Sequence, residues 1–157
     1  MAEVYPEKSL IVSRIKDIEI RITPKVISNI LGISNSDQTV FGDKWFEELG
    51  VDPTKVYKLL LKPNVSEFVS SNLLPTPKMF NGISQHCVIP RNGNFQLVNA
   101  NDLLITYHLF KKEKLNLCHL IVHNMISVIQ NRNKKYCLPY GMALTIKQES
   151  KSHEAGT

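Results

Sequence analysis

The apolar pattern begins with two short segments that are typical of β-strands. Residues 10–12 are all apolar, and residues 18–22 alternate strictly between isoleucine and a charged side chain. Alternation with a period of two buries one face of a strand and leaves the other in water. Lys16 and Asp17 lie between the segments, where a turn is required. We therefore predict an N-terminal β-hairpin.

Helical patterns with recognisable ends follow the hairpin. Thr23 suits the N-cap position, Pro24 the first helical position, and Gly32 the left-handed residue that stops a helix. An apolar stripe runs between them. Similar signals predict three more helices, which cover residues 43–49 before Gly50, the segment from Asp52-Pro53 through Leu60, and residues 63–72.

Residues 75–99 carry a different pattern. Three prolines and two glycines are mixed with Asn and Ser, which is typical of an irregular connection. A connection of this length without structure is uncommon inside a compact domain. We expect either a flexible loop or insertion, or a strand hidden at residues 87–89.

The two strongest helical patterns lie further along the chain. Residues 101–112 are apolar nearly all round, so this helix should be central, while residues 116–131 carry one broad apolar face. The short link at Glu113-Lys114 predicts that the two helices are antiparallel and share one interior. Its expected buried residues are Leu104, Tyr107, Ile121, Met125 and Val128.

These elements predict the fold class α+β, mainly α, with the N-terminal β-hairpin packed on a multi-helix core. The 157 residues are 43% hydrophobic and 21% charged, which suits one globular domain. We place this domain at residues 10–148, with a last helix at 139–148. Residues 1–9 are expected to be a flexible N-terminus and residues 149–157 a disordered tail.

The composition predicts an intracellular protein, cytoplasmic or nuclear, that does not contact a membrane. No stretch reaches the roughly 18 apolar residues that a membrane span needs. Acidic residues and a proline occupy the first eight positions, where a signal peptide has a basic start. Cys87, Cys118 and Cys137 are odd in number and form no Cys-x-x-Cys pair, as expected for reduced thiols.

The net charge of +5 is unevenly distributed. Residues 1–50 hold six Lys and Arg against eight Asp and Glu, whereas residues 51–157 hold thirteen against six. Two basic clusters close successive predicted helices, roughly 24 Å apart along the second one. Both could contact phosphate, or could simply complement the C-terminal helix dipoles. The clusters are Lys111, Lys112 and Lys114, and Arg132, Lys134 and Lys135.

No pattern indicates catalysis or a bound cofactor or metal. His119 and His123 are spaced to bind a metal from one helix face, but no third ligand is evident and both fall on the polar side. His86 and Cys87 are adjacent in sequence without a reason to form a dyad. Asp102 is explained as a first-turn helix acid. Phosphate-binding glycine loops and nucleophile motifs are absent from the sequence.

The order of motifs resembles the putative plant transposon protein domain, a family found in plant retroelements and in host genes derived from them. The resemblance covers roughly residues 10–148. It rests first on the capped helix of residues 22–32 and on the Asn-Leu-Leu-Pro-Thr segment at 72–76. Two helices follow that segment, and Leu-Asn-Leu at 115–117 opens the second of them. Leu138-Pro139 then precedes the last helix. Residues 79–96 look like extra length.

The resemblance implies a transposon-derived protein and carries no established activity or site residues. Clustered carboxylates for metal-dependent strand transfer are not recognisable in the sequence. We therefore expect a non-enzymatic domain that interacts with other protein chains. Two alternatives stay open, a nucleic-acid-binding domain that uses the basic C-terminal half, and a decayed retroelement fragment without a function.

Overall fold

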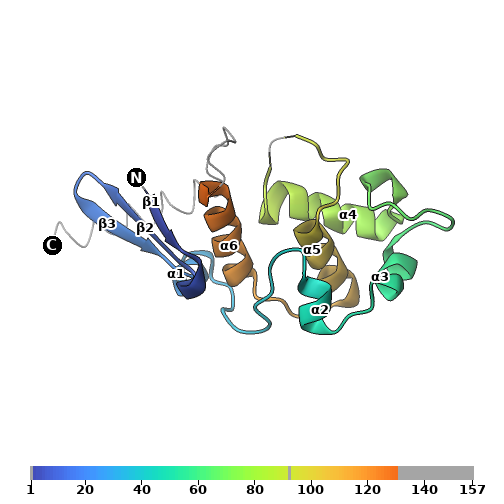
Figure 1. Cartoon of the computed structure of the whole chain (residues 1–157), viewed down its shortest axis with the longest axis horizontal. Coiled ribbons are helices and arrows are strands. Elements are labelled where there is room, and N and C mark those ends of the chain that lie inside the picture. Colours follow the sequence, from blue (N-terminus) through green and yellow to red (C-terminus); the bar gives the residue numbers. More distant parts are fainter. Residues whose placement is uncertain (1, 92, 131–157) are drawn as a thin grey trace. The chain divides into compact units, whose positions relative to one another are not determined.

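The computed structural model describes residues 2–91 and 93–130 and divides the chain into two compact units (Figure 1). Unit 1 comprises residues 1–36 and 116–157, and unit 2 comprises residues 37–115. The helix expected at 139–148, the tail at 149–157 and Cys137 lie outside the described residues. Each unit has its own set of elements and its own buried side chains.

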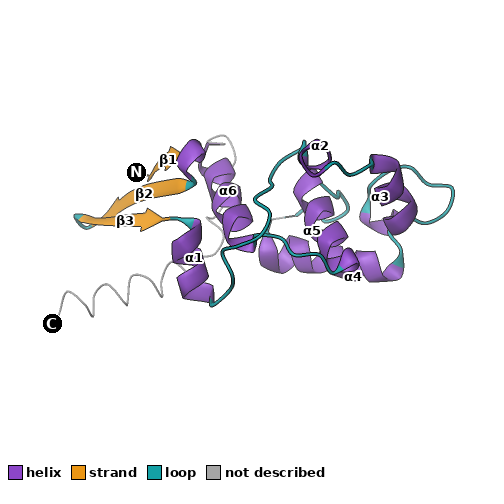
Figure 2. Cartoon of the chain, turned by 90° about the horizontal axis from the view of Figure 1, so that it is seen from below, coloured by secondary structure: helices purple, strands orange, loops and turns teal. Residues whose placement is uncertain are grey.

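Unit 1 begins with a three-stranded antiparallel sheet in the order β1-β2-β3 (Figure 2). The strands are β1, Ala2–Tyr5, β2, Leu10–Ile15, and β3, Ile18–Ile22. The predicted hairpin is confirmed, and its turn residues Lys16 and Asp17 have φ of 48° and 64°. Two successive positive φ angles give a turn whose twist matches that of the strands. Residues 2–5, which we assigned to a flexible N-terminus, pair instead with β2.

Two helices complete unit 1, α1, Pro24–Leu31, and α6, Leu117–Gln130. The caps of α1 are those predicted: Val26 N–H donates to Thr23 Oγ1 at 3.3 Å, and Gly32 has φ of 66°. Helix α6 packs on α1, β1 and β2. The apolar faces of these elements form one buried cluster, composed of Ile11, Ile20, Ile22, Ile27, Cys118, Ile121, Val122, Met125 and Ile126.

Unit 2 is helical. Its α-helices are α2, Trp45–Leu49, α3, Pro53–Leu60, α4, Pro75–Ile83, and α5, Ala100–Lys111. A short 3-10 turn, η2, Ser70–Asn72, precedes α4, and a π-helical turn, η3, Ser84–Val88, follows it. The predicted end of α2 at Gly50 and start of α3 at Asp52 are confirmed. Helix α4 packs on α5, whose Leu104 is fully buried.

The helix that we predicted over residues 63–72 is wrong. Backbone hydrogen bonds connect Lys62 N–H to Asn72 C=O and Leu74 N–H to Leu60 C=O, at 2.8 and 2.9 Å. These bonds pair Leu61 with Leu73 across the segment, so its two ends lie together. Only η2 is helical there. The periodicity of the apolar residues did not reveal this pairing of distant positions.

Residues 75–99, expected as an irregular loop or insertion, contain α4 and η3 instead. Pro75 and Pro77 lie in the first turn of α4, where a missing N–H disrupts no intrahelical bond. Residues 87–89 contain no strand, because η3 runs to Val88. The prolines therefore mark the start of a helix.

Helices α5 and α6, which we expected to share one interior, belong to different units. Helix α5 buries Leu104 within unit 2, while α6 contributes Ile121 and Met125 to the core of unit 1. Tyr107 and Val128 are half-buried. Within unit 1, the apolar face of α6 meets the β-sheet and α1. The predicted fold class is nevertheless confirmed, since the chain is mainly helical with an N-terminal antiparallel sheet.

Candidate functional site

A buried carboxylate organises the start of α5. Asp102 occupies the third position of the helix and is fully buried. Its N–H donates to Asn99 Oδ1 at 2.9 Å, and Asn99 N–H donates back to Asp102 Oδ2 at 3.3 Å. This reciprocal arrangement is a capping box, which satisfies two otherwise unpaired helix donors. The prediction of Asp102 as a first-turn helix acid is confirmed.

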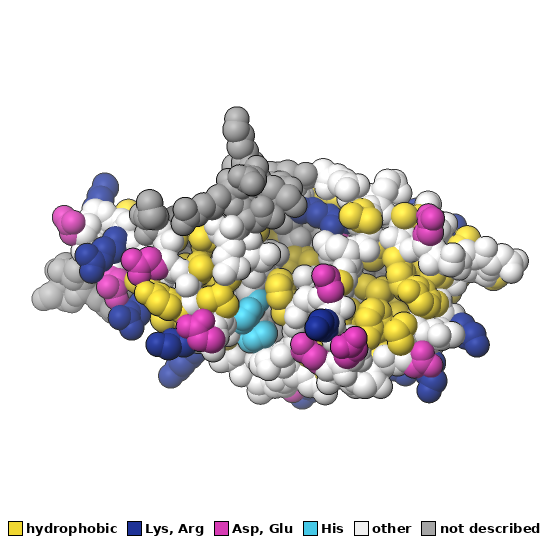
Figure 3. Space-filling view, in the orientation of Figure 1, with side chains coloured by type: hydrophobic (Ala, Val, Ile, Leu, Met, Phe, Trp, Pro, Cys, Tyr) yellow, Lys and Arg dark blue, Asp and Glu magenta, His cyan; other side chains and the backbone are white. Residues whose placement is uncertain are grey.

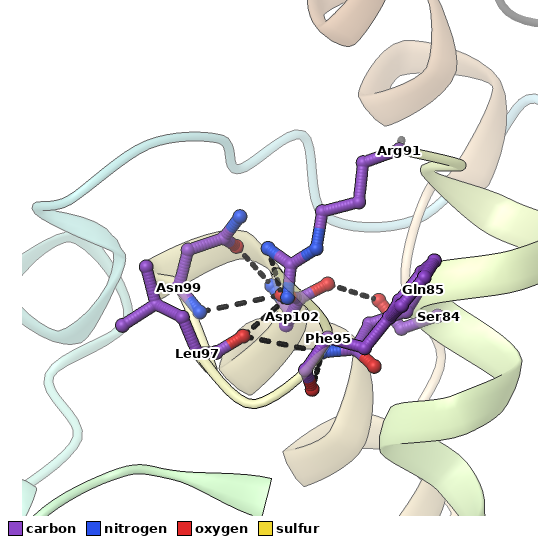
Figure 4. Close-up of polar contacts among 7 residues, drawn as sticks. All are labelled: Ser84, Gln85, Arg91, Phe95, Leu97, Asn99 and Asp102. Atoms are coloured by element: carbon purple, nitrogen blue, oxygen red, sulfur yellow. Dashed lines mark hydrogen bonds and ion pairs between the residues drawn. The ribbon is translucent and has the colours of Figure 1, made fainter. Parts of the chain in front are cut away.

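Two further side chains reach the same carboxylate (Figure 4). Arg91 Nη1 lies 3.0 Å from Asp102 Oδ2, and Ser84 Oγ donates to Asp102 Oδ1 at 2.9 Å. Arg91 also donates through Nη2 to the carbonyl of Leu97. We call Arg91, Asp102 and Ser84, together with Gln85, the polar lock. It joins η3, residues 89–91 and 93–99, and α5.

Gln85 completes the polar lock from the adjacent position of η3. Its Nε2 donates to the carbonyls of Phe95 and Leu97, at 3.0 and 3.1 Å (Figure 4). A π-helical turn widens the helix, and here Ser84 and Gln85 are both buried although they are neighbours in sequence. The turn therefore holds the loop at two carbonyl groups.

The electrostatics of the polar lock favour a positioning role. Burial raises the pKa of Asp102, while the Arg91 cation and the Ser84 hydroxyl act to lower it. A buried carboxylate is tolerated when it is paired and hydrogen-bonded, as it is here. Its oxygens bind groups of the same chain, and its side chain has no exposure to solvent. Asp102 therefore fixes a loop to the start of α5.

Unit 2 exposes apolar side chains next to the polar lock. Met79 and Ile83, four residues apart on α4, are 59% and 41% exposed. His86 follows on η3 and stacks on Phe95, with ring centroids 4.5 Å apart. We call Met79, Ile83, His86 and Phe95 the apolar strip. Elsewhere in the unit, Tyr57 of α3 is 39% exposed and stacks on Phe68, with ring centroids 4.6 Å apart. Figure 3 shows hydrophobic side chains gathered near α3.

The predicted phosphate contacts are only partly within the described residues. Lys111, Lys112 and Lys114 are exposed at the end of α5, where positive charge complements the helix dipole. Lys112 has φ of 56° and ends the helix. The second cluster, Arg132, Lys134 and Lys135, lies outside the described residues. Residues 2–91 and 93–130 together hold fourteen Lys and Arg against twelve Asp and Glu, and Figure 3 shows both signs interspersed on one face.

His119 and His123 do not face solvent as we expected. Both are half-buried on α6, with ring centroids 4.1 Å apart. Ser9 Oγ and His123 Nε2 lie 2.8 Å apart. Burial, and then the charge of His123, lower the pKa of His119 to about 4, and burial lowers the pKa of His123. Among the residues that the structure describes, no three His, Cys, Asp or Glu side chains gather as a metal site.

The polar lock was not predicted from the sequence, for identifiable reasons. Asn99 and Asp102 have the spacing of a capping box, a signal that was available. The contributions of Arg91, Ser84 and Gln85 depend on η3, and no periodic pattern announces a π-helical turn. The adjacent His86 and Cys87 are both exposed, with His86 stacked on Phe95.

A family model described as "Putative plant retrotransposon-related domain" matches residues 1–146. This match confirms the resemblance to a plant retroelement-derived family. No curated protein and no solved structure matches the chain. Within residues 2–91 and 93–130, no helix is long and apolar enough to cross a membrane.

Proposed function

Because the chain belongs to the plant retrotransposon-related domain family, we propose that it is a non-enzymatic module of a retroelement-derived protein. Its role is to bind other protein chains, and unit 2 carries the binding surface. The family match supports the retroelement origin. The binding role is supported by the surface of unit 2.

The exposure of large apolar side chains is the observation that carries this proposal. Unit 2 contains seven of the ten that are exposed in the described chain: Tyr57, Val65, Met79, Ile83, Phe95, Leu97 and Leu109. Scattered exposed apolar residues are normal on proteins, whereas adjoining ones mark interaction surfaces. The apolar strip meets this criterion, because its members are neighbours on one helix face or stack on each other.

The polar lock also supports the proposal that unit 2 carries a binding surface. It fixes the carbonyls of Phe95 and Leu97, and so it orders the loop that presents Phe95 to solvent. A surface that is ordered before binding loses less conformational entropy when a partner arrives. The hydrogen bonds around Asp102 therefore stabilise a binding surface, and this role involves no catalytic step.

The distribution of charged residues gives less support to nucleic acid than to protein as the binding partner. Non-specific nucleic-acid binding depends on Lys and Arg that neutralise phosphates. The described residues are close to neutral in sum, and the remaining excess falls at residues 131–157, with five Lys and Arg against two acids. Nucleic-acid binding is accordingly the lesser proposal and would depend on that segment.

A display screen of plant protein fragments against the immobilised full chain tests the proposal. Each binder should then be tested on a variant with Met79→Ser and Ile83→Ser, and on a variant with Ile15→Ser and Ile18→Ser as the control. Protein ligands that bind the control and fail to bind the α4 variant are expected. Ligands that bind both variants equally, or a screen that yields no protein ligand, would count against it.

A further inference from the structure

Ser9 joins the turn after β1 to α6. It follows the short 3-10 turn η1, Pro6–Lys8, and has φ of 48° and ψ of 47°. This left-handed conformation is unfavourable for a serine, so contacts around it must hold it in place. Its N–H donates to Pro6 C=O at 3.1 Å, and its hydroxyl lies 2.8 Å from His123 Nε2. The side-chain contact spans 114 positions of the sequence.

The second histidine makes this contact sensitive to protons. The ring of His119 lies 4.1 Å from that of His123, one helical turn away. Its Nδ1 is buried and has no hydrogen-bond partner in the described chain. Protonation would place an N–H donor at or near this atom without an acceptor, beside a second ring that can also become charged. Both effects oppose the packed arrangement.

The elements near the pair also carry charged side chains. Lys and Glu side chains of the neighbouring elements are exposed, as are their arginines. These groups are Glu3 of β1, Glu7 and Lys8 of η1, Arg14 of β2 and Lys25 of α1. Burial and the charge of His123 are the causes that lower the pKa of His119.

We propose that Ser9, His119 and His123 form a proton-operated latch. At neutral pH it holds β1 and its turn against α6, and in acid it releases them. Release allows Ser9 to leave its left-handed conformation, and it uncovers the core residues against which Ala2 and Val4 pack. The latch therefore controls the edge of the sheet formed by β1, while β2, β3 and α1 keep their own contacts.

The direction of the response follows from linkage. A histidine in the released state titrates near its ordinary value of 6.5, whereas His119 in the closed state has a pKa of about 4. Between these values the released state binds more protons, so release becomes more favourable as the pH falls from 6.5 towards 4. Above 6.5 both states are neutral and the latch is insensitive to pH.

Hydrogen–deuterium exchange of the full chain at pH 7.5 and pH 5.0, corrected for intrinsic rates, tests the latch. Exchange in residues 2–12 should accelerate more than tenfold in acid, while residues 20–30 change much less. A variant with His119→Gln and His123→Gln should lose this pH response, and His86→Gln should keep it. Ser9→Gly, which removes the hydroxyl and tolerates the backbone, should show fast β1 exchange already at pH 7.5.

Three outcomes would overturn the latch. In the first, the faster exchange of residues 2–12 in acid persists in the variant with both histidines replaced by glutamine. In the second, the natural chain shows no faster exchange of these residues in acid. In the third, exchange accelerates equally over all of residues 2–36 in the natural chain, which would indicate acid unfolding of unit 1 as a whole. This last comparison needs no variant, so the test stands even where a substitution prevents folding.

Discussion

Arg91 Nη1 lies 3.0 Å from Asp102 Oδ2, and through this contact a loop residue neutralises a fully buried helix acid. The pair is surrounded by hydrogen bonds from Ser84 and Asn99. Breaking a buried pair by removing one partner is much more costly than replacing both. The ion pair is therefore one of the contacts that hold residues 89–91 and 93–99 to the start of α5, together with the hydrogen bonds of Gln85, and its contribution can be measured.

Replacing Arg91→Gln should destabilise unit 2 by about 3 kcal/mol, since the carboxylate of Asp102 stays buried without its cation. Urea unfolding at pH 7.5 measures the loss. Arg14→Gln is a matched control, because its contact with Glu19 at 3.7 Å is exposed and should contribute little to stability. Equal effects of the two substitutions would show that the buried pair is no stronger than the exposed one.

The penalty of Arg91→Gln should shrink in acid. Burial already raises the pKa of Asp102, and removing Arg91 raises it further. Folding then favours the neutral carboxyl, so stability relative to the natural chain increases as the pH falls towards the ordinary aspartate value. Unfolding curves at pH 7.5 and 5.0 check this. A penalty that is larger at pH 5.0 would contradict the assignment of Asp102 as the group left unpaired.

Leu104→Ala should lower the stability of unit 2 by about 2–5 kcal/mol, because the leucine is completely buried in the helical core. Leu109→Ala on the same helix is the control, with 40% of its side chain exposed. It should change stability by less than about 1 kcal/mol. Thermal melting of both variants distinguishes them, and similar midpoints would mean that the core is wrongly placed.

Zinc should not stabilise the chain. His119 and His123 are half-buried and are engaged with each other and with Ser9, and the described residues bring no third ligand to them. Melting curves with and without equimolar zinc are expected to coincide. A rise in midpoint that a chelator reverses and that His123→Asn abolishes would establish a metal site in spite of this geometry.

Neutralising Lys111, Lys112 and Lys114 together to Gln should leave any nucleic-acid affinity unchanged. It should cost at most about 0.3–1 kcal/mol of stability per charge, because these residues act on the C-terminal dipole of α5. Mobility shift at two salt concentrations measures the affinity. A complex that weakens steeply with salt and is lost in this variant would support phosphate contacts instead.

Local signals in the sequence predicted local structure well. The caps at Thr23, Asp52 and Gly50 and the hairpin turn at Lys16-Asp17 act over a few residues, so they can be read directly. The prediction of a helix at residues 63–72 was wrong because the pairing of Leu61 with Leu73 leaves no periodic pattern of apolar residues in the sequence. Pro75 and Pro77 were read as breakers although they begin a helix.

Features that join distant positions could not be predicted. Nothing in the pattern around Arg91 indicates that its partner is Asp102, because that contact needs the π-helical turn of η3. The same holds for Ser9 and His123, which meet only once β1 and α6 have packed. The division of α5 and α6 between two units was missed because an apolar face shows that a helix is buried, without showing which partner buries it.

The affinity of a selected protein ligand for the full chain and its two serine variants tests the central claim most directly. Calorimetric titration should show that Met79→Ser with Ile83→Ser weakens binding at least tenfold, while Ile15→Ser with Ile18→Ser leaves it within twofold. Both pairs expose similar apolar area in the natural chain, at 59% and 41% against 44% and 52%. Equal affinity of all three chains for the ligand would contradict a binding surface on α4.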